Sequence, residues 1–290
     1  MHRYLFHNGE IRDARDLCLS PGQVGLMTGW GVFSTLLVCD GVLFAWERHW
    51  ARMRQDAAKL QVPFPPESTE LERGLARLIE ANQAWNATLR VMVIRNRGGQ
   101  WEGPSVSRDF DLIAFTANLK QWEPSVKLDV VPNARLAACE FAGVKYLSWA
   151  VNLIWYERAR SRGLDEAILL NERGEVSECT SANIFVAQGG RVWTPPLVSG
   201  CLPGVTRAVL LEEISVPGLE IGEKTLYLTD LEHADEAFIT STTRELLPVA
   251  SVEGLQVRRG GGVSSRLQAA LAANLQAYVA PRRRPTAVPR

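Results

Sequence analysis

One lysine of this chain stands where an amine could act as a nucleophile. Lys145 is the only charged residue of the stretch 141–155, FAGVKYLSWAVNLIW, and lysines make up only five of the 32 basic residues. Burial disfavours the ammonium form, and the neutral amine that results can form a Schiff base with a carbonyl compound. The alternative is a lysine whose stem packs on apolar neighbours while its head reaches water. From this feature alone the alternative is favoured.

Four further features are typical of sites that orient a basic nitrogen or bind an anion. Glu178 lies in GEVSECTSANIF, where a carboxylate between a strand and an Asn-containing turn can hold a basic nitrogen. The segment 202–207, LPGVTR, indicates a loop entering a helix, where the first N–H groups are free to bind an anion. The hydroxyl-rich segment 240–243 follows a predicted strand, and Arg52 lies in the helical stretch RHWARM. Each feature alone is explained as well by a surface strand end, a capped helix, a turn or a solvated face.

The order and spacing of these residues form a more specific pattern. Glu178 and Thr180 are followed by Asn183-Ile184-Phe185, by Val192-Trp193-Thr194 and by Leu202-Pro203-Gly204-Val205-Thr206-Arg207. In this pattern the chain resembles the pyridoxal-phosphate enzymes of fold type IV. These include branched-chain aminotransferases, D-amino acid aminotransferases and aminodeoxychorismate lyases. The resemblance extends from Gly31 to Pro248. It implies a two-domain α+β fold like that of D-amino acid aminotransferase, with pyridoxal 5′-phosphate as cofactor between the domains.

The resemblance also implies roles for individual residues. Lys145 matches the lysine that forms the Schiff base and moves a proton between Cα of the substrate and C4′ of the cofactor. Glu178 matches the carboxylate that keeps the pyridine nitrogen protonated. Arg52 matches the arginine that binds the phosphate. The other cofactor-binding positions that the resemblance implies are Leu202 on the ring and Gly204, Val205, Thr206 and Thr242 around the phosphate. The substrate-binding positions that it implies are Phe33, Arg90 and Thr243.

The markers of the individual subfamilies point in different directions. Branched-chain enzymes carry Asn-Tyr shortly after the lysine, whereas Lys145 is followed by Tyr146-Leu147-Ser148 here. The lyases show Lys-x-Leu-Asn, and Ser148 occupies the position of that Asn. Gln100 falls where the lyases keep an arginine, although the stretch 31–38, GVFSTLLV, looks more like a lyase. Phe33 favours an apolar substrate pocket. We expect an aminotransferase that moves an amino group between an amino acid, best an L-branched-chain one, and a 2-oxo acid. The alternatives are 4-amino-4-deoxychorismate lyase and D-amino acid aminotransferase.

Two α+β domains are expected to position these residues. Asp40-Gly41 between apolar runs predicts a hairpin over 34–45, and helical periodicity follows over 47–60. The other predicted elements are a helix after Pro65-Pro66, strands at 89–94, 112–117 and 128–131, a helix at 148–162, hairpins at 166–177 and 183–194, a helix from Gly204, a strand at 236–240 and a helix at 263–279. The predicted domains are 1–118 and 126–280, with a linker at 119–125 and a basic tail at 281–290.

Composition and charge exclude several classes of protein. Hydrophobic residues make up 46% of the 290 residues, which excludes a disordered chain, and the net charge of zero gives no pull toward nucleic acid or membrane. There is no membrane-spanning apolar run and no signal-peptide core at the start. Five scattered cysteines and four histidines lack disulfide or metal-ligand spacing, so we expect no metal and a reducing cytoplasm. The family resemblance adds small-molecule substrates and a homodimer.

Overall fold

A computed structural model describes residues 1–100, 106–258 and 260–283 of the chain. Its internal contacts divide the chain into two compact units. Unit 1 comprises Met1–Lys120, Lys145–Ser148 and Leu275–Arg290, and unit 2 comprises Gln121–Val144 and Trp149–Asn274. Within the described ranges, none of the helices combines the length and the apolar character that crossing a bilayer requires.

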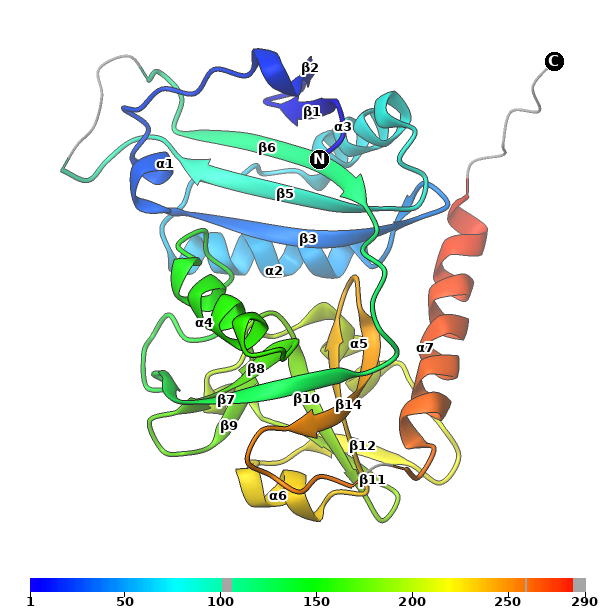
Figure 1. The fold of residues 1–290 in the computed structure, drawn as a ribbon. Helices are drawn as coiled ribbons and strands as arrows, with labels where there is room; N and C mark the ends of the chain where they lie inside the picture. Colours follow the sequence, from blue (N-terminus) through cyan, green and yellow to red (C-terminus); the bar gives the residue numbers. More distant parts are fainter. Residues whose placement is uncertain (101–105, 259, 284–290) are drawn as a thin grey trace. The chain divides into compact units, whose positions relative to one another are not determined.

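Unit 1 is built on a six-stranded sheet covered by two long helices (Figure 1). In sheet order the strands are β2 (Glu10–Asp13), β1 (Tyr4–His7), β6 (Phe110–Asn118), β5 (Ala87–Arg95), β3 (Gly31–Cys39) and β4 (Val42–Leu43). The helices are η1 (Ala14–Asp16), α1 (Val24–Thr28), α2 (Trp46–Lys59) and α3 (Ser68–Asn82). All neighbouring strands of this sheet run antiparallel.

The helix α2 runs beside β3 because its apolar residues recur at helical spacing (Figure 1). Trp46, Trp50, Met53 and Ala57 belong to one buried cluster with apolar residues of the sheet. Burying a side chain of the size of Met53 contributes about 1.5–3 kcal/mol. The same face of α2 also buries three polar residues, which are His49, Arg52 and Asp56. The core that fixes α2 therefore fixes these polar groups as well.

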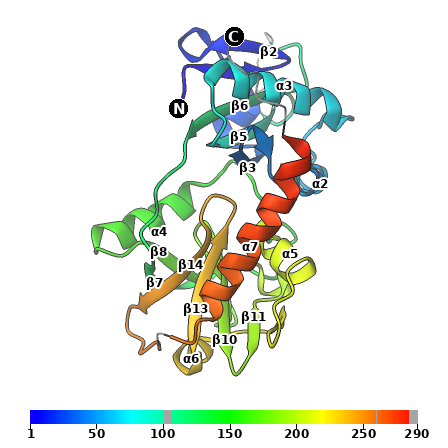
Figure 2. The same cartoon turned by 90° about the vertical axis from the view of Figure 1, so that its right-hand side faces the viewer.

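Unit 2 holds an eight-stranded mixed sheet. In sheet order its strands are β12 (Glu220–Glu223), β11 (Arg191–Thr194), β10 (Asn183–Gln188), β13 (Glu236–Ser241), β14 (Glu245–Val252), β7 (Val126–Arg135), β8 (Glu166–Asn171) and β9 (Val176–Cys179). Its helices are α4 (Ala150–Ser161), η2 (Leu197–Ser199), α5 (Val205–Glu212) and α6 (Leu228–His233), together with the first part of α7 (Val263–Val279). Figure 2 shows α5 and α7 beside β13. The strands β8 and β9 are buried at every residue, as expected for strands covered on both faces.

The packing units differ from the predicted domain ranges at two places. Residues 145–148 count with unit 1 because their backbone pairs with β3: Phe33 N–H donates to Lys145 O at 3.2 Å, and Leu147 N–H donates to Gly31 O at 2.9 Å. The chain from Leu275 also counts with unit 1, because the Tyr278 hydroxyl donates to Glu47 at 2.6 Å. After Val279 a short turn, η3 (Ala280–Arg282), follows. Of the predicted tail, 284–290 lies outside the described residues.

Candidate active site

Lys145 lies in unit 1, next to an aromatic ring and a buried carboxylate. Its Nζ is 4.5 Å from the centroid of the Phe33 ring. Its backbone N–H donates to Asp56 Oδ2 at 3.3 Å. Phe33 is almost fully buried, whereas Lys145 is half-buried. The amine therefore lies beside an aromatic ring, on a side chain that is itself only half-buried.

Arg52 is buried on α2 and is tied to β3 through a serine. Its Nη2 donates to Ser34 Oγ at 2.9 Å, and Ser34 Oγ lies 2.7 Å from His49 Nδ1. Ser34 Oγ therefore links the Arg52 guanidinium, from which it accepts, to the His49 ring. Burial, with the charges of Arg52 and Lys145, holds the pKa of His49 well below its usual value. The pKa of Arg52 is lowered by burial to about 10, so it stays a cation at neutral pH.

Arg90 reaches the same aromatic ring from the neighbouring strand. In the β3–β5 register Arg90 pairs with Thr35, which shares a sheet face with Phe33 because side chains alternate along a strand. The Arg90 guanidinium carbon lies 3.9 Å from the Phe33 ring centroid. Burial lowers the pKa of Arg90. The structure thus brings Phe33, Arg90 and Lys145 together, and it ties Arg52 to Ser34, the residue after Phe33 on β3.

Glu178 lies on β9 in unit 2, and each of its oxygens accepts a hydrogen bond. Arg135 Nε donates to Oε1 at 3.0 Å, and the backbone N–H of Leu202 donates to Oε2 at 3.0 Å. The carboxylate is nearly buried, with 9% of the residue exposed. The surface strand end that the isolated motif favoured is therefore not what the structure has. Arg135 was not predicted as a site residue, because no motif of the sequence links it to a glutamate 43 positions away.

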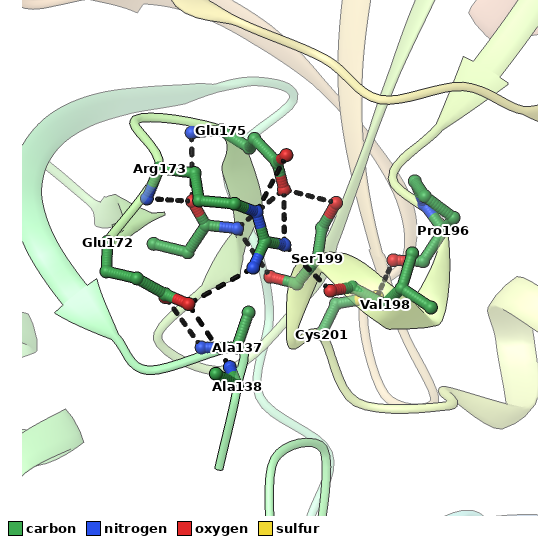
Figure 3. Close-up of polar contacts among 10 residues, drawn as sticks. Ala137, Ala138, Glu172, Arg173, Glu175, Pro196, Val198, Ser199 and Cys201 are labelled. Carbon is green, nitrogen blue, oxygen red and sulfur yellow. Dashed lines mark hydrogen bonds and ion pairs between the residues drawn. The ribbon is translucent and has the colours of Figure 1, made fainter.

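A polar network holds the two chain segments that donate hydrogen bonds to Glu178, which carry Arg135 and Leu202 (Figure 3). The Glu172 carboxylate accepts the backbone N–H groups of Ala137 at 2.7 Å and Ala138 at 3.2 Å, directly after Arg135. Arg173 donates to Val198 O at 2.9 Å. Glu175 accepts from Ser199 Oγ at 3.0 Å. The β8–β9 turn therefore fixes both the Arg135 segment and the loop that leads to Leu202.

The start of α5 presents backbone N–H groups without a capping side chain. Gly204 is the residue before the helix, it has an extended backbone, and no side chain caps the N–H groups that follow. Val205 and Thr206 are buried, and the first turn carries no acidic residue. A helix start of this kind, with a threonine hydroxyl beside free N–H groups, suits a phosphate.

The end of β13 supplies further hydroxyls, and the turn to β14 follows it. Thr240 Oγ1 and Ser241 Oγ are buried and have no hydrogen-bond partner among the described residues. Trp122 Nε1 donates to Thr243 O at 3.1 Å, which fixes the turn that carries Thr242 and Thr243. Buried hydroxyls without partners are uncommon in proteins, and a bound anion would satisfy them.

Arg244, the last residue of this turn, forms a buried ion pair with Glu166. Arg244 Nη2 donates to Glu166 Oε2 at 3.2 Å, and its guanidinium carbon lies 4.1 Å from the Trp122 ring centroid. Ser181 Oγ donates to the same Glu166 oxygen at 2.6 Å. The pair joins the segment after β9 to the β13–β14 turn. Sequence reasoning missed both charged residues, because they meet only through the strand order of the folded sheet.

Each unit, considered by itself, carries residues that suit groups of pyridoxal phosphate. An amine for its aldehyde and a guanidinium for its phosphate lie in unit 1. A carboxylate for its ring nitrogen, a helix start and unpartnered hydroxyls for its phosphate lie in unit 2. The described part of the chain holds no cluster of three His, Cys, Asp or Glu arranged for a metal ion.

The close contact at Gly204 gives a testable prediction. A Cβ there would lie 2.0 Å from Asn183 Oδ1, and Asn183 cannot turn away because its Nδ2 donates to Leu202 O at 2.9 Å. We expect Gly204→Ala to lower the free energy of unfolding of the cofactor-free protein by about 1–3 kcal/mol, as overpacking does. Denaturant unfolding measures this cost. An equal cost in an Asn183→Ala background would contradict the assigned clash, since removing the amide relieves it.

Comparison with known proteins places this geometry in a family. The family described as amino-transferase class IV matches residues 31–252. The chain is 30% identical to the branched-chain-amino-acid aminotransferase of Salmonella typhimurium, over 92% of this chain and 91% of that protein. It is 28% identical to the D-alanine aminotransferase of Bacillus licheniformis, over 91% of this chain and 94% of that protein.

A solved structure agrees with the sequence comparison. The branched-chain amino acid aminotransferase from Escherichia coli superposes with a TM-score of 0.85 at 27% identity, covering 95% of each chain. The predicted fold class, a two-domain α+β fold of type IV, is thereby confirmed. The chain belongs to the class IV aminotransferase family, whose members are pyridoxal-phosphate-dependent enzymes of fold type IV.

Proposed function

We propose that this protein is an aminotransferase that moves the amino group of an L-branched-chain amino acid to a 2-oxo acid with pyridoxal phosphate. The observation that carries the proposal is the position of Lys145 Nζ, 4.5 Å from the Phe33 ring centroid and on a segment that α2 holds through Asp56. An amine beside an aromatic surface suits an amino acid with an apolar side chain. When bound, pyridoxal phosphate supplies an aldehyde carbon that couples to amines and a ring that withdraws electrons from Cα.

Lys145 has two tasks in this proposal. Its Nζ would hold the cofactor covalently. The same amine would take and give the proton at Cα of the substrate, as a general base and acid. The Phe33 ring beside Nζ keeps water from that side of the amine. Phe33, Arg90 and Thr243 are the residues proposed to face the substrate.

Each unit carries groups that are proposed to bind phosphate. Arg52 supplies the charge, since its pKa of about 10 keeps the guanidinium protonated at neutral pH. Gly204, Val205 and Thr206 supply the start of α5, and Thr242 supplies a hydroxyl from the β13–β14 turn. Phosphate at such a helix start satisfies N–H groups that have no intrahelical acceptor.

Glu178 is proposed to hold a proton on the ring nitrogen of the cofactor, and Leu202 to pack on the ring. Two donors fix the Glu178 carboxylate at 3.0 Å each, which supports a defined orientation toward a third partner. A carboxylate accepts about four hydrogen bonds in all, so its two oxygens retain capacity for the ring N–H.

A homodimer in the cytoplasm is the proposed assembly and location. The helix α4 exposes Val151, Leu153 and Ile154, each about half accessible to solvent. Neighbouring apolar side chains of this kind on a helix are typical of surfaces that contact another protein. A second copy of the chain is the proposed occupant of this face.

A single-turnover absorbance scan distinguishes the substrate classes. We expect the holoenzyme to convert to the pyridoxamine form with L-leucine, L-isoleucine or L-valine. If only D-amino acids convert the enzyme, the protein is still an aminotransferase, but its substrates are D-amino acids and the proposed L-substrate is wrong. If no amino acid converts the enzyme, and pyruvate with aminobenzoate is released from aminodeoxychorismate, the protein is a lyase and the proposal is wrong. Among the L-amino acids, one methylene more or less in the side chain changes the free-energy preference of an apolar pocket by only about 1–3 kcal/mol.

A further inference from the structure

The buried face of α2 carries a carboxylate that the roles above do not use. Asp56 is only 4% exposed. It follows Arg52 by four residues, so the two side chains are neighbours on the same helix face. Its Oδ2 accepts the backbone N–H of Lys145, which is 89 positions away in the sequence, at 3.3 Å. One helix thus carries both the proposed phosphate arginine and a direct contact to the proposed nucleophile.

Asp56 lies among positive charges. The pKa of Asp56 is raised, because burial outweighs the opposite effects of the Arg52, Lys59 and Lys145 charges and of the hydrogen bond from the Lys145 backbone. His49, one turn before Arg52 on the same helix, stays neutral because burial lowers its pKa. Among Asp56 and the groups that act on it, Asp56 is the one whose ionised form is negative.

On the sheet side, an aromatic ring and a second guanidinium lie near Lys145. From β3 the Phe33 ring faces its Nζ at 4.5 Å, and the Arg90 guanidinium of β5 lies 3.9 Å from the centroid of the same ring. Ser34 of β3 is engaged by Arg52 and His49. A cation beside an apolar surface is better tolerated where a carboxylate lies close, and Asp56 of α2 is a buried carboxylate that contacts the Lys145 backbone.

We propose that Asp56 is a positioning residue for Lys145, holding its backbone against α2 and supplying the negative charge that keeps Lys145 and Arg52 close to each other. The inference rests on the proposed function of Lys145. Asp56 itself touches no reacting atom. Its effect is exerted through the position and charge environment of the lysine.

Two substitutions separate the hydrogen bond from the charge. Asp56→Asn keeps an oxygen that accepts the Lys145 N–H but removes the charge, and Asp56→Leu removes both. The first readout is the pH midpoint of the visible absorbance of the lysine-linked cofactor in the holoenzyme. Removing a nearby negative charge disfavours a positive Lys145 nitrogen, so the midpoint is expected about one pH unit lower in both variants. The second readout is the rate at which added pyridoxal phosphate acquires this absorbance. It is expected to fall about 10-fold to 100-fold in Asp56→Leu and little in Asp56→Asn.

Glu72→Gln is the matched control, because Glu72 is an exposed carboxylate on α3 of the same unit. It is expected to leave both readouts at the wild-type values. A wild-type midpoint in Asp56→Asn, or an equal shift in Glu72→Gln, overturns the proposal. If Asp56→Leu does not fold, the isosteric Asn variant still decides the charge role. Failure of the role proposed for Lys145 looks different, because the wild-type protein then acquires no visible absorbance and this inference falls with it.

Discussion

Replacing Lys145 with alanine is expected to lower turnover by at least about 10⁴-fold. Proton transfer by a positioned group alone contributes about 10²–10⁴-fold, and Lys145 is proposed to attach the cofactor covalently as well. Phosphate binding is expected to persist, since Arg52 and the start of α5 do not involve the lysine amine. Steady-state transamination and cofactor retention after gel filtration measure the two effects separately.

The matched control for this prediction is Lys127→Ala. Lys127 is an exposed lysine of β7, and it is expected to be dispensable for turnover. Both variants are compared at equal cofactor occupancy. Turnover of Lys145→Ala near the wild-type rate would remove the lysine from its proposed role.

Glu178→Gln is expected to slow the half-reaction with an amino acid by about 10²-fold or more. The neutral amide no longer stabilises a proton on the ring nitrogen, so the ring withdraws electrons from Cα less strongly. The substitution also places an NH₂ group opposite Arg135 Nε or the Leu202 N–H, both of which are donors. One hydrogen bond is therefore lost whichever way the amide turns. Stopped-flow absorbance gives the rate of the half-reaction.

Glu220→Gln provides the comparison for the loss of one carboxylate charge. Glu220 is an exposed residue of β12 whose Oε2 lies 3.4 Å from Arg191 Nε. Its replacement is expected to leave the rate of the half-reaction unchanged, because exposed ion pairs contribute little. An unchanged half-reaction rate in Glu178→Gln would contradict the role assigned to this glutamate. A rate that falls equally in both variants would do the same, because it would show a nonspecific effect of charge.

The long periodic elements could be predicted from the sequence. The helix predicted over 47–60 is α2 at Trp46–Lys59, and the helix predicted over 263–279 is α7 with the same limits. The Asp40-Gly41 turn joins β3 to β4 as expected, with both turn residues at positive φ. In each case the signal is local, since apolar spacing or turn chemistry within one segment determines the element.

Other elements carried no such local signal. The strand β14 was missed because Pro248 stands inside it, and a proline argues against a strand. The N-terminal pair β1 and β2 has only four residues in each strand. The strand β7 extends to Arg135, beyond the predicted 128–131, through an irregular pairing with β8 after Val131. This extension puts Arg135 beside Glu178.

For the candidate site too, the sequence predicted local patterns but not contacts between distant parts of the chain. Motif spacing marked Glu178 and the 202–207 loop because they belong to one continuous pattern, and their contact through the Leu202 N–H spans only 24 positions. The contacts of Asp56 with Lys145 and of Glu166 with Arg244 span 89 and 78 positions. Helix packing and strand order create such contacts, so residue types along the chain do not reveal them.

The most direct test of the account is borohydride reduction of the holoenzyme followed by peptide mapping. The account predicts that the purified protein with pyridoxal phosphate is yellow and that borohydride removes the colour. It also predicts that the phosphopyridoxyl group is then found on the peptide containing Lys145. A colourless protein that takes up no cofactor, or a label on any other lysine, would contradict the central claim.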